Sequence, residues 1–338
     1  MSFRKRNSHT KSKRADSTKI HVVVRVRPRI AEDLDSTIHK RPGASAYEEC
    51  VEEDEARSSV FLKKPYFDTR EFAFDCVLGR GATQAQAYEA VARGVVDDVM
   101  AGFNGTILAY GQTGTGKTHT IYGPLSYWRR PGRTSWIEPS ASAAGSARAA
   151  QLQEGGLLPQ LELSGIVTRA ALQIFATVDE RRAADAARSM QFAVSLSSLQ
   201  IYQESTSDLL ADPAHSPPLQ VREDPAHGVY VEGLSEHPVT SPEHVLELVH
   251  ESATNRATCS TSMNRASSRS HALLLLRVEQ ANLPPDEPPP DDDASNGVSA
   301  ASEATTALAV RRAVLSIVDL AGSERVCKSG SEGTRLDE

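Results

Sequence analysis

Apolar and polar positions along the chain alternate between short strand-like runs and longer helical segments. "KIHVVVRVRPR" holds a run of valines that ends at Pro28 and predicts a buried strand. Residues 85–101 predict a helix that ends at Gly102. Its apolar side chains recur at helical spacing: Tyr88, Val91, Val95 and Val99. The run "TILAY" at 106–110 follows and predicts another strand.

The same alternation continues through the second half of the chain. "MQFAVSLSSLQIYQ", "GVYVEGL", "HALLLLRVEQ" and "RRAVLSIVDLAG" read as strands. Between them, "SPEHVLELVHESATNR" predicts a helix with Ser241 as its cap and Pro242 in its first turn. Alternating strands and helices favour an α/β fold, with one mainly parallel central sheet and helices on both faces.

Three segments depart from this pattern. We predict that residues 1–18 are a disordered basic arm, since the first 19 residues carry seven Lys or Arg and one acid. Alternatively, this arm contacts an acidic partner or serves as a nuclear signal. Residues 124–155, rich in Ser, Ala, Arg, Gly and Pro, and residues 281–306, with "LPPDEPPPDDDASNG", are predicted disordered inserts. We expect one domain over residues 19–338.

Composition excludes several classes of protein. With 338 residues and 39% hydrophobic content, the chain can bury a core, and its net charge of -7 argues against a nucleic-acid partner. No run approaches the roughly 20 apolar residues that span a bilayer, so we expect no membrane insertion and a cytoplasmic location. The cysteines lack a CxxC pair, which suits reduced thiols: Cys50, Cys76, Cys259 and Cys327.

"GQTGTGKT" fits the phosphate-binding pattern G-x-x-x-x-G-K-T directly after a predicted strand. Its glycines let backbone N–H groups face phosphate oxygens, Lys117 brings charge to the β- and γ-phosphates, and the Thr118 hydroxyl can ligate Mg²⁺. A Gly/Thr-rich turn that matches by chance is the alternative. The predicted nucleotide-binding residues are Gly111, Gln112, Thr113, Gly114, Thr115, Gly116, Lys117 and Thr118.

Two further motifs are weak alone and stronger together. "NRASSRSH", from Asn264 to His271, could be an ordinary polar loop before a strand. "DLAGSE" ends an apolar strand, where Asp319 could hold a Mg²⁺-bound water and the following Gly322 could offer its N–H to a γ-phosphate. Their order after the phosphate-binding loop supports a nucleoside triphosphate site.

With these motifs the chain resembles the kinesin motor domain. "RVRP", "GQTGTGKT", "NRASSRSH" and "VDLAGSER" are similar to the four nucleotide-pocket motifs of that family, in the same order. The resemblance runs from about Lys19 to the last residue, apart from the two inserts. It implies the kinesin form of the P-loop NTPase α/β fold, ATP and Mg²⁺ as cofactors, and microtubules as partner.

The resemblance also implies which residues form the base-binding side of the pocket. Arg25, Arg27 and Pro28 would line the adenine, with His119 nearby, and no N-K-x-D guanine motif occurs in the chain. ATP is therefore expected rather than GTP. Alternatively, the two arginines are solvent-facing strand residues and the proline simply ends the strand.

By the same resemblance, the other two motifs are the switches that respond to the γ-phosphate. Ser267 and Ser268 would belong to switch I, and Gly322 of switch II would sense the phosphate through its N–H. Arg269 and Glu324 would form an ion pair between the switches when ATP is bound. The implied Mg²⁺ ligands are Thr118, Ser268 and, through water, Asp319.

The sequence departs from the family after switch II. The elements that follow this switch in kinesins are not in the sequence, so we expect a C-terminally incomplete motor domain that lacks its last strand and helices. Dimerisation and cargo segments would be absent as well, and apolar sheet surface would be exposed. "KSGSEG" is similar to the cilium- and flagellum-associated subfamily, which would add that location to the microtubule cytoskeleton.

Three functions remain open at this stage. The first is a microtubule-stimulated ATPase, with tubulin contacts from the "VYVEGLSEH" region around Glu232 and the loop with Arg325 and Lys328. The second is a truncated fragment that binds nucleotide or tubulin without cycling. The third is a P-loop enzyme unrelated to motility. The complete switch motifs argue against the third.

Overall fold

The computed structural model describes nine stretches of the chain. They are residues 20–29, 50–64, 67–124, 162–185, 190–212, 219–224, 228–260, 269–282 and 310–324. These stretches belong to two compact units, Met1–Arg80 and Gly81–Glu338. The predicted arm at 1–18 lies outside the described residues, as do the predicted inserts at 124–155 and 281–306, apart from residues 124, 281 and 282.

The first unit consists of strands. Strand β1 (Val23–Arg25) pairs in parallel with β5 (Cys76–Leu78). A separate antiparallel sheet has the order β2 (Val51–Asp54), β3 (Ser59–Lys64), β4 (Phe67–Ala73). The strand predicted in the valine run is confirmed, but its side chains are half-buried rather than buried. Within the described residues β1 pairs with β5 alone, whereas a central strand has a neighbour on each side. The side chains of β1 are therefore less covered than those of a central strand.

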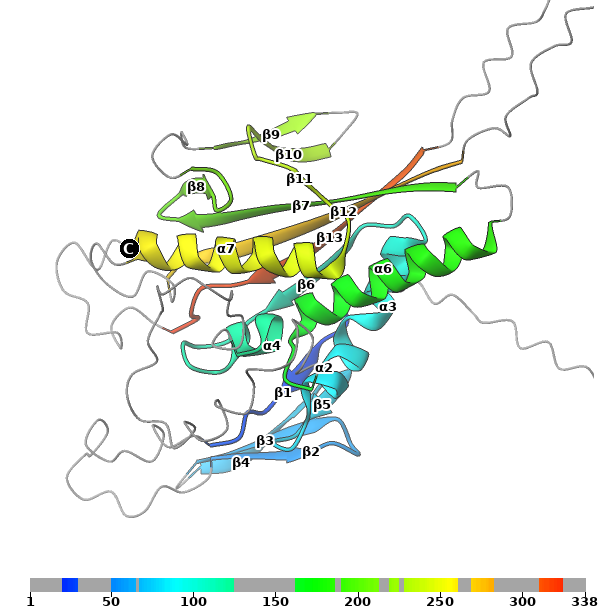
Figure 1. The fold of residues 1–338 in the computed structure, drawn as a ribbon. Helices are drawn as coiled ribbons and strands as arrows, with labels where there is room; N and C mark the ends of the chain where they lie inside the picture. Colours follow the sequence, from blue (N-terminus) through cyan, green and yellow to red (C-terminus); the bar gives the residue numbers. More distant parts are fainter. Residues whose placement is uncertain are drawn as a thin grey trace, which may run out of the picture. The chain divides into compact units, whose positions relative to one another are not determined.

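The second unit is built on a six-stranded sheet with the order β11-β7-β12-β13-β6, to which β8 adds at β7 (Figure 1). Its strands are β6 (Gly105–Ala109), β7 (Met190–Tyr202), β8 (Ser205–Asp208), β11 (His237–Val239), β12 (His271–Asn282) and β13 (Val310–Asp319). Strands β9 (Gln220–Asp224) and β10 (Gly228–Glu232) form a separate antiparallel hairpin.

Strand directions in this sheet differ from the prediction. The β13–β6 pair is parallel, whereas β11–β7, β7–β8, β7–β12 and β12–β13 are antiparallel. The sheet is therefore mixed, which corrects the expectation of a mainly parallel one, while the α/β class holds. Parallel pairing requires a crossover connection, usually a helix. The Pro- and Asp-rich sequence between β12 and β13 has no periodic apolar pattern that would supply one.

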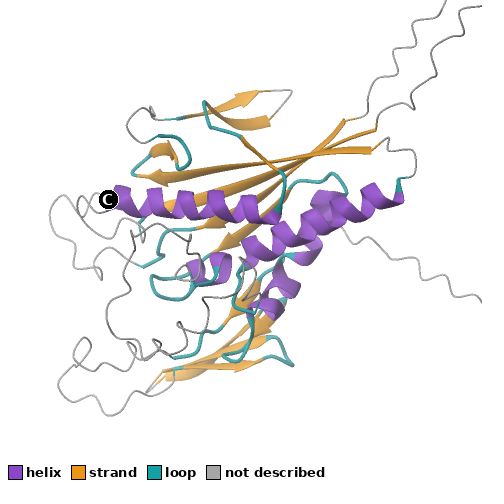
Figure 2. Cartoon of the chain, in the orientation of Figure 1, coloured by secondary structure: helices purple, strands orange, loops and turns teal. Residues whose placement is uncertain are grey.

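The helices of the second unit are α2 (Gln84–Val91), α3 (Arg93–Met100), α4 (Lys117–Tyr122), α6 (Ile166–Ala184) and α7 (Pro242–Ser260), coloured purple in Figure 2. The single helix predicted over 85–101 is two helices that meet at Ala92. Thr83 caps the first of them through a reciprocal capping box with Gln86. The predicted cap of α7 is confirmed, because Ser241 accepts the backbone N–H of His244 at 3.2 Å.

The main hydrophobic core lies on one face of the sheet. Directly paired residues of neighbouring strands supply that face, and α2, α3, α4, α6 and α7 add side chains to it. Its sheet members include Leu196, Leu274, Leu276, Leu315, Ile317 and Ile107. Helices were predicted on the opposite face of the sheet as well. The described helices of this unit all contribute to this one core, so none of them forms a layer on the opposite face.

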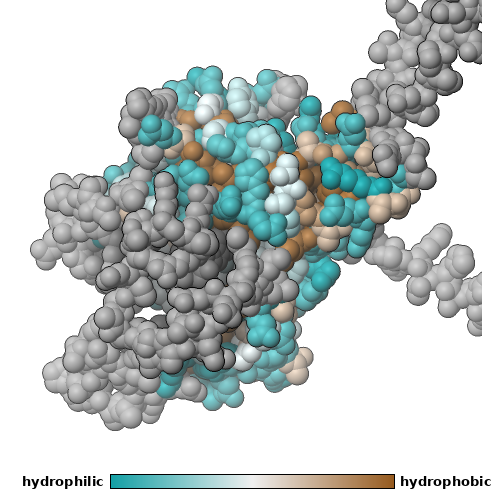
Figure 3. All heavy atoms as spheres, in the orientation of Figure 1, coloured by the Kyte–Doolittle hydropathy of each residue, from teal (hydrophilic) through white to brown (hydrophobic). Residues whose placement is uncertain are grey.

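Apolar side chains also reach the surface. Leu108 of β6 is 60% exposed and Tyr110 is 78% exposed. Figure 3 shows hydrophobic residues interspersed with hydrophilic ones on the visible face of the described residues. None of the described helices is long and apolar enough to cross a bilayer.

Candidate functional site

The phosphate-binding loop runs from the end of β6 to the start of α4. Gly111, Gly114 and Gly116 have φ angles of 154°, 81° and 96°, a region of backbone space that favours glycine. The N–H of Thr115 donates to the carbonyl of Gln112 at 3.3 Å, which makes the loop a tight turn. The structure therefore gives this segment the turn-and-helix geometry that the sequence pattern predicts.

Lys117, the first residue of α4, reaches back over this turn. Its ammonium donates to the carbonyl oxygens of Gly111 at 2.9 Å and Gln112 at 3.0 Å. The positive charge therefore lies beside the loop whose glycines favour anion binding.

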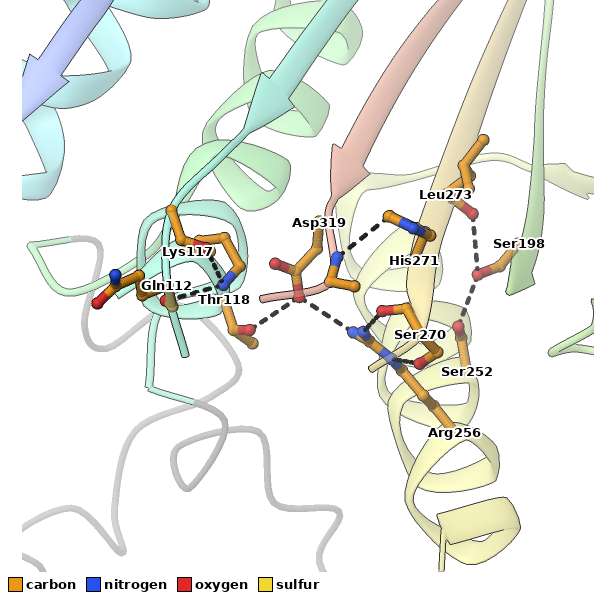
Figure 4. Close-up of polar contacts among 12 residues, drawn as sticks. Gln112, Lys117, Thr118, Ser198, Ser252, Arg256, Ser270, His271, Leu273 and Asp319 are labelled. Carbon is orange, nitrogen blue, oxygen red and sulfur yellow. Dashed lines mark hydrogen bonds and ion pairs between the residues drawn. The ribbon is translucent and has the colours of Figure 1, made fainter. Parts of the chain in front are cut away.

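Thr118 and Asp319 connect this loop to the end of β13. The Thr118 hydroxyl donates to Oδ2 of Asp319 at 2.8 Å, although the two residues are far apart in the sequence (Figure 4). The Asp319 side chain is 2% exposed, and its Oδ1 is buried with no hydrogen-bond partner among the described residues. A buried carboxylate oxygen without a donor is costly.

Arg256 of α7 contacts the same carboxylate. Its Nη1 lies 3.0 Å from Oδ2 of Asp319, and the arginine side chain is 11% exposed. The guanidinium also donates to the carbonyl of Ser270 at 2.8 Å. Figure 4 shows it between α7, the start of β12 and the end of β13.

The segment that follows Asp319 continues along the phosphate-binding loop. The N–H of Leu320 donates to Ala109 and that of Ser323 to Gly111, at 3.3 and 3.1 Å. The N–H of Ala321 donates to Nδ1 of His271 at 3.1 Å, so this ring nitrogen carries no proton. Hydrogen bonds therefore hold the "DLAGSE" segment to both the loop and the first residue of β12.

Glu324 ends this segment against Thr113 of the loop. Its Oε2 accepts the Thr113 N–H at 2.9 Å, and its Oε1 accepts the Thr113 hydroxyl. Burial raises the pKa of the Glu324 carboxyl, but these hydrogen bonds and the charge of Lys117 outweigh burial, so the pKa is lower than usual. A Cβ on Gly322 would overlap with the Glu324 carboxylate and the Thr113 hydroxyl, so a side chain at this position would push the carboxylate away from its place beside the loop.

His119 of α4 is held by a buried glutamine. Gln84 Nε2 donates to the His119 carbonyl at 2.7 Å and lies 3.2 Å from its Nδ1. The Gln84 residue is 4% exposed, so this pair fixes the predicted base-side histidine against α2.

The structure brings together five of the predicted site residues that are far apart in the sequence. They are Lys117, Thr118, Asp319, Gly322 and Glu324, together with the remaining residues of the loop. Ser267 and Ser268 lie outside the described residues. The predicted ion pair of Arg269 with Glu324 concerns the ATP-bound chain and stays a prediction; here Thr113 contacts both carboxylate oxygens.

The predicted adenine-side residues belong to the first unit. Burial lowers the pKa of Arg25, and Arg27 donates to the carbonyl of Pro28 at 3.3 Å. Their place beside the nucleotide stays a prediction. Among the predicted tubulin contacts, Glu232 ends β10 and pairs with Arg222, whereas Arg325 and Lys328 lie outside the described residues.

Sequence reasoning missed Gln84, Arg256 and His271. A signal for Arg256 was present, because Val245, Val249 and Ser252 precede it at helical spacing and are all buried. A charged residue at a core-facing position of a helix indicates a buried ionic contact. Gln84 and His271 gave no comparable signal, since their contacts depend on how distant segments meet.

Comparison with known proteins matches this arrangement to a family. The family model described as "Kinesin motor domain" matches residues 8–338. The chain belongs to the kinesin family. It is 34% identical to the Kinesin-like protein KIN-UA of Arabidopsis thaliana over 95% of this chain, and 35% identical to Kinesin-related protein 5 of Dictyostelium discoideum over 79%.

A solved structure of a fast kinesin is also similar, with a TM-score of 0.66 and 28% identity over 94% of this chain and 70% of that one. This likeness confirms the kinesin form of the α/β P-loop fold. The chain spans 29% of the length of KIN-UA and 21% of Kinesin-related protein 5. These matches lend no support to the predicted ciliary subfamily or location.

Proposed function

We propose that this kinesin chain binds Mg-ATP and hydrolyses it to ADP and phosphate, as the nucleotide-driven part of a microtubule motor. The observation that carries the proposal is the contact between Thr118 of the phosphate-binding loop and Asp319 at the end of β13. A hydroxyl and a carboxylate at these two positions are what P-loop NTPases use at their magnesium site.

The described residues fit a magnesium ion. No group of three His, Cys, Asp or Glu side chains within them could hold a metal by itself. Mg²⁺ commonly takes one or two protein oxygens and keeps waters and phosphate oxygens as its other ligands. Thr118 donates its proton to Asp319, which leaves its oxygen lone pairs for the ion. The unpartnered Oδ1 of Asp319 could accept from a water on that ion.

The loop glycines would present backbone N–H groups to the phosphates, and Lys117 would exchange its two carbonyl contacts for β- and γ-phosphate oxygens. Gly322 would offer its N–H to the γ-phosphate. The base would lie against Arg25, Arg27 and Pro28, with His119 nearby. When bound, Mg²⁺ would neutralise charge on the phosphates.

Turnover requires the switches to hold a water in line with the γ-phosphate. Ser267 and Ser268 would close over the site, with Ser268 as a second hydroxyl ligand for the metal. Glu324 would leave Thr113 and pair with Arg269, which would join the two switches. A relay of water and carboxylate would then take the proton of the attacking water.

The expected partner is the microtubule, and the expected location is the cytoplasm and its cytoskeleton. Positive charge on the loop with Arg325 and Lys328 suits an acidic surface such as that of tubulin. Glu232 belongs to the other predicted contact region, the β9–β10 hairpin, which also carries the exposed side chains of Val221 and Val229.

Phosphate release by the purified chain, with and without polymerised tubulin, tests the proposal. We expect slow release that tubulin stimulates, and loss of both activity and binding of a labelled ATP analogue in Lys117→Ala. Lys63→Ala is a matched control, because Lys63 is an exposed lysine of the first unit that pairs with Glu52.

Two results would count against it. Binding of the analogue without tubulin-stimulated release would favour a fragment that holds nucleotide without cycling. Retained affinity in Lys117→Ala would mean that the phosphates bind elsewhere.

A further inference from the structure

An exposed aromatic residue lies directly beside the phosphate-binding loop. His119 is the third residue of α4, one position after Thr118, and it is exposed. If the loop and the first turn of α4 hold phosphates, the ribose and base attached to them must lie near the same end of this helix. The imidazole ring of His119 offers a flat face there, on which a base can stack.

One side of this ring is held by a buried amide. Gln84 begins α2 and is 4% exposed. Its Nε2 lies 2.7 Å from the His119 carbonyl oxygen and 3.2 Å from Nδ1 of the His119 ring. A carbonyl oxygen can only accept, so the atom beside it must be the amide nitrogen and not the amide oxygen. The same nitrogen therefore donates its second hydrogen to Nδ1, and the proton of the neutral ring lies on Nε2.

Gln84 does more than satisfy a backbone carbonyl. The His119 carbonyl already accepts the N–H of Gly123 at 2.9 Å, so it has a partner without the amide. What Gln84 adds is a fixed orientation of the ring. The donor is itself well placed, because a capping box of Thr83 and Gln86 orders the first turn of α2. A side chain that is ordered before its ligand arrives loses less conformational entropy on binding.

We propose that Gln84 is a positioning residue for the nucleotide base: it holds the His119 ring in the orientation in which the base stacks on it. Gln84 acts through His119 and not through the phosphate contacts of Lys117 and Thr118. The inference rests on the proposed function, because it requires the triphosphate to bind in the loop.

The two ends of the ligand separate this role from general support of the site. Inorganic tripolyphosphate has the phosphate chain of ATP without the ribose and the base. A residue that acts on the base should therefore change the affinity for ATP and leave the affinity for tripolyphosphate unchanged. A residue that supports the loop or α4 as a whole should weaken the binding of both ligands alike.

The measurement is competition of ATP and of tripolyphosphate, each with Mg²⁺, against a labelled ATP analogue on the full 338-residue chain. Gln84→Met keeps an unbranched side chain at this position and removes both hydrogen bonds. Stacking of a base on an aromatic side chain contributes about five- to 140-fold in affinity, and a ring that is no longer held should keep part of this. We expect Gln84→Met to bind ATP about three- to tenfold more weakly, and tripolyphosphate within about twofold of the unmodified chain.

Gln280→Met is the matched control. Gln280 is another buried glutamine, 8% exposed, whose Nε2 donates to a backbone carbonyl, that of Met100, at 2.9 Å. Gln280 belongs to β12 and Met100 ends α3, and neither is among the residues of the proposed nucleotide site. We expect this substitution to leave the ratio of the two affinities unchanged.

A double-mutant cycle with His119→Ala tests whether Gln84 acts through the ring. In the His119→Ala background, Gln84→Met should have little further effect on the ratio of the two affinities. An unchanged ratio in Gln84→Met, additive effects in the cycle, or an equal change in Gln280→Met would overturn the inference. Should Gln84→Met fail to fold, Gln84→Leu carries the same cycle.

The unmodified chain separates failure of this inference from failure of the proposed function. If it binds tripolyphosphate as tightly as ATP, the base adds nothing, which would overturn the inference and leave the phosphate site in place. Binding of neither ligand would instead count against the proposed function.

Discussion

The contact between Glu324 and Thr113 gives a prediction that separates nucleotide binding from turnover. Glu324→Ala removes a carboxylate that accepts both the backbone N–H and the hydroxyl of Thr113. It leaves Lys117 and Thr118 of the loop unchanged. We therefore expect affinity for an ATP analogue to change by less than about tenfold, whereas steady-state hydrolysis is lost because the switches can no longer pair.

The effect on stability follows from the same two hydrogen bonds. A hydrogen bond to a charged group contributes about 1.5–3 kcal/mol, and partial solvent exposure of Glu324 reduces this value. We expect a loss of about 1–2 kcal/mol in the free energy of unfolding. For a domain of this size that corresponds to a fall in Tm of about 2–4 °C per kcal/mol.

The pH dependence of this loss is a second test. The pKa of Glu324 is lower than usual in the folded chain, so its contribution is present above the ordinary glutamate pKa, about 4.3, and disappears as pH falls through the lowered value. The difference in unfolding free energy between the unmodified chain and Glu324→Gln should be constant from about pH 6 to 8 and shrink in acid.

Thr113→Val is the matched control for Glu324→Ala. It removes the hydroxyl of the pair while keeping the backbone N–H and a similar shape, so it should lose only part of the stability. Unchanged steady-state hydrolysis in Glu324→Ala would refute the assigned role. Loss of nucleotide binding in that variant would show that the carboxylate supports the loop itself.

Substitutions at four further residues test other parts of the structure. Leu276→Ala in the core should lower the free energy of unfolding by about 3–5 kcal/mol in urea, whereas Leu108→Ala at an exposed position should change it by less than about 1 kcal/mol. Ser241→Ala should cost about 1 kcal/mol by removing the cap of α7, and Ser241→Asp should restore it. Gly322→Ala should displace Glu324 and lower hydrolysis as Glu324→Ala does; normal hydrolysis there would show that the segment can shift.

The sequence predicted those parts of the fold that depend on local pattern. The helix with Ser241 as its cap and the strand before the phosphate-binding loop both follow from periodicity and end signals, and both are present. The predicted strand direction, a mainly parallel sheet, was wrong, because direction depends on pairing across the sheet rather than on local residue order. The division of the first helix at Ala92 was missed, although Gly94, two residues further on, is a residue that weakens a continuous helix.

The residues of the candidate site likewise include some that local sequence pattern predicted and some that it did not. The loop residues could be predicted because their spacing itself determines the phosphate-binding geometry. Asp319 was found through its position at the end of an apolar strand. The spacing of α7 indicated only that Arg256 faces the core. Its partners could not be predicted, because Asp319 and Ser270 come from other segments that meet α7 only in the folded chain.

The register of β12 and β13 bears on how the chain can be engineered. Ala281 lies opposite Val310, so the segment at 283–309 leaves and re-enters the sheet at neighbouring points. Each halving of such a connection lowers the entropic cost of closing it by about 0.6 kcal/mol. A short turn could therefore replace this segment, or a reporter domain be grafted into it, without separating the two strands from each other.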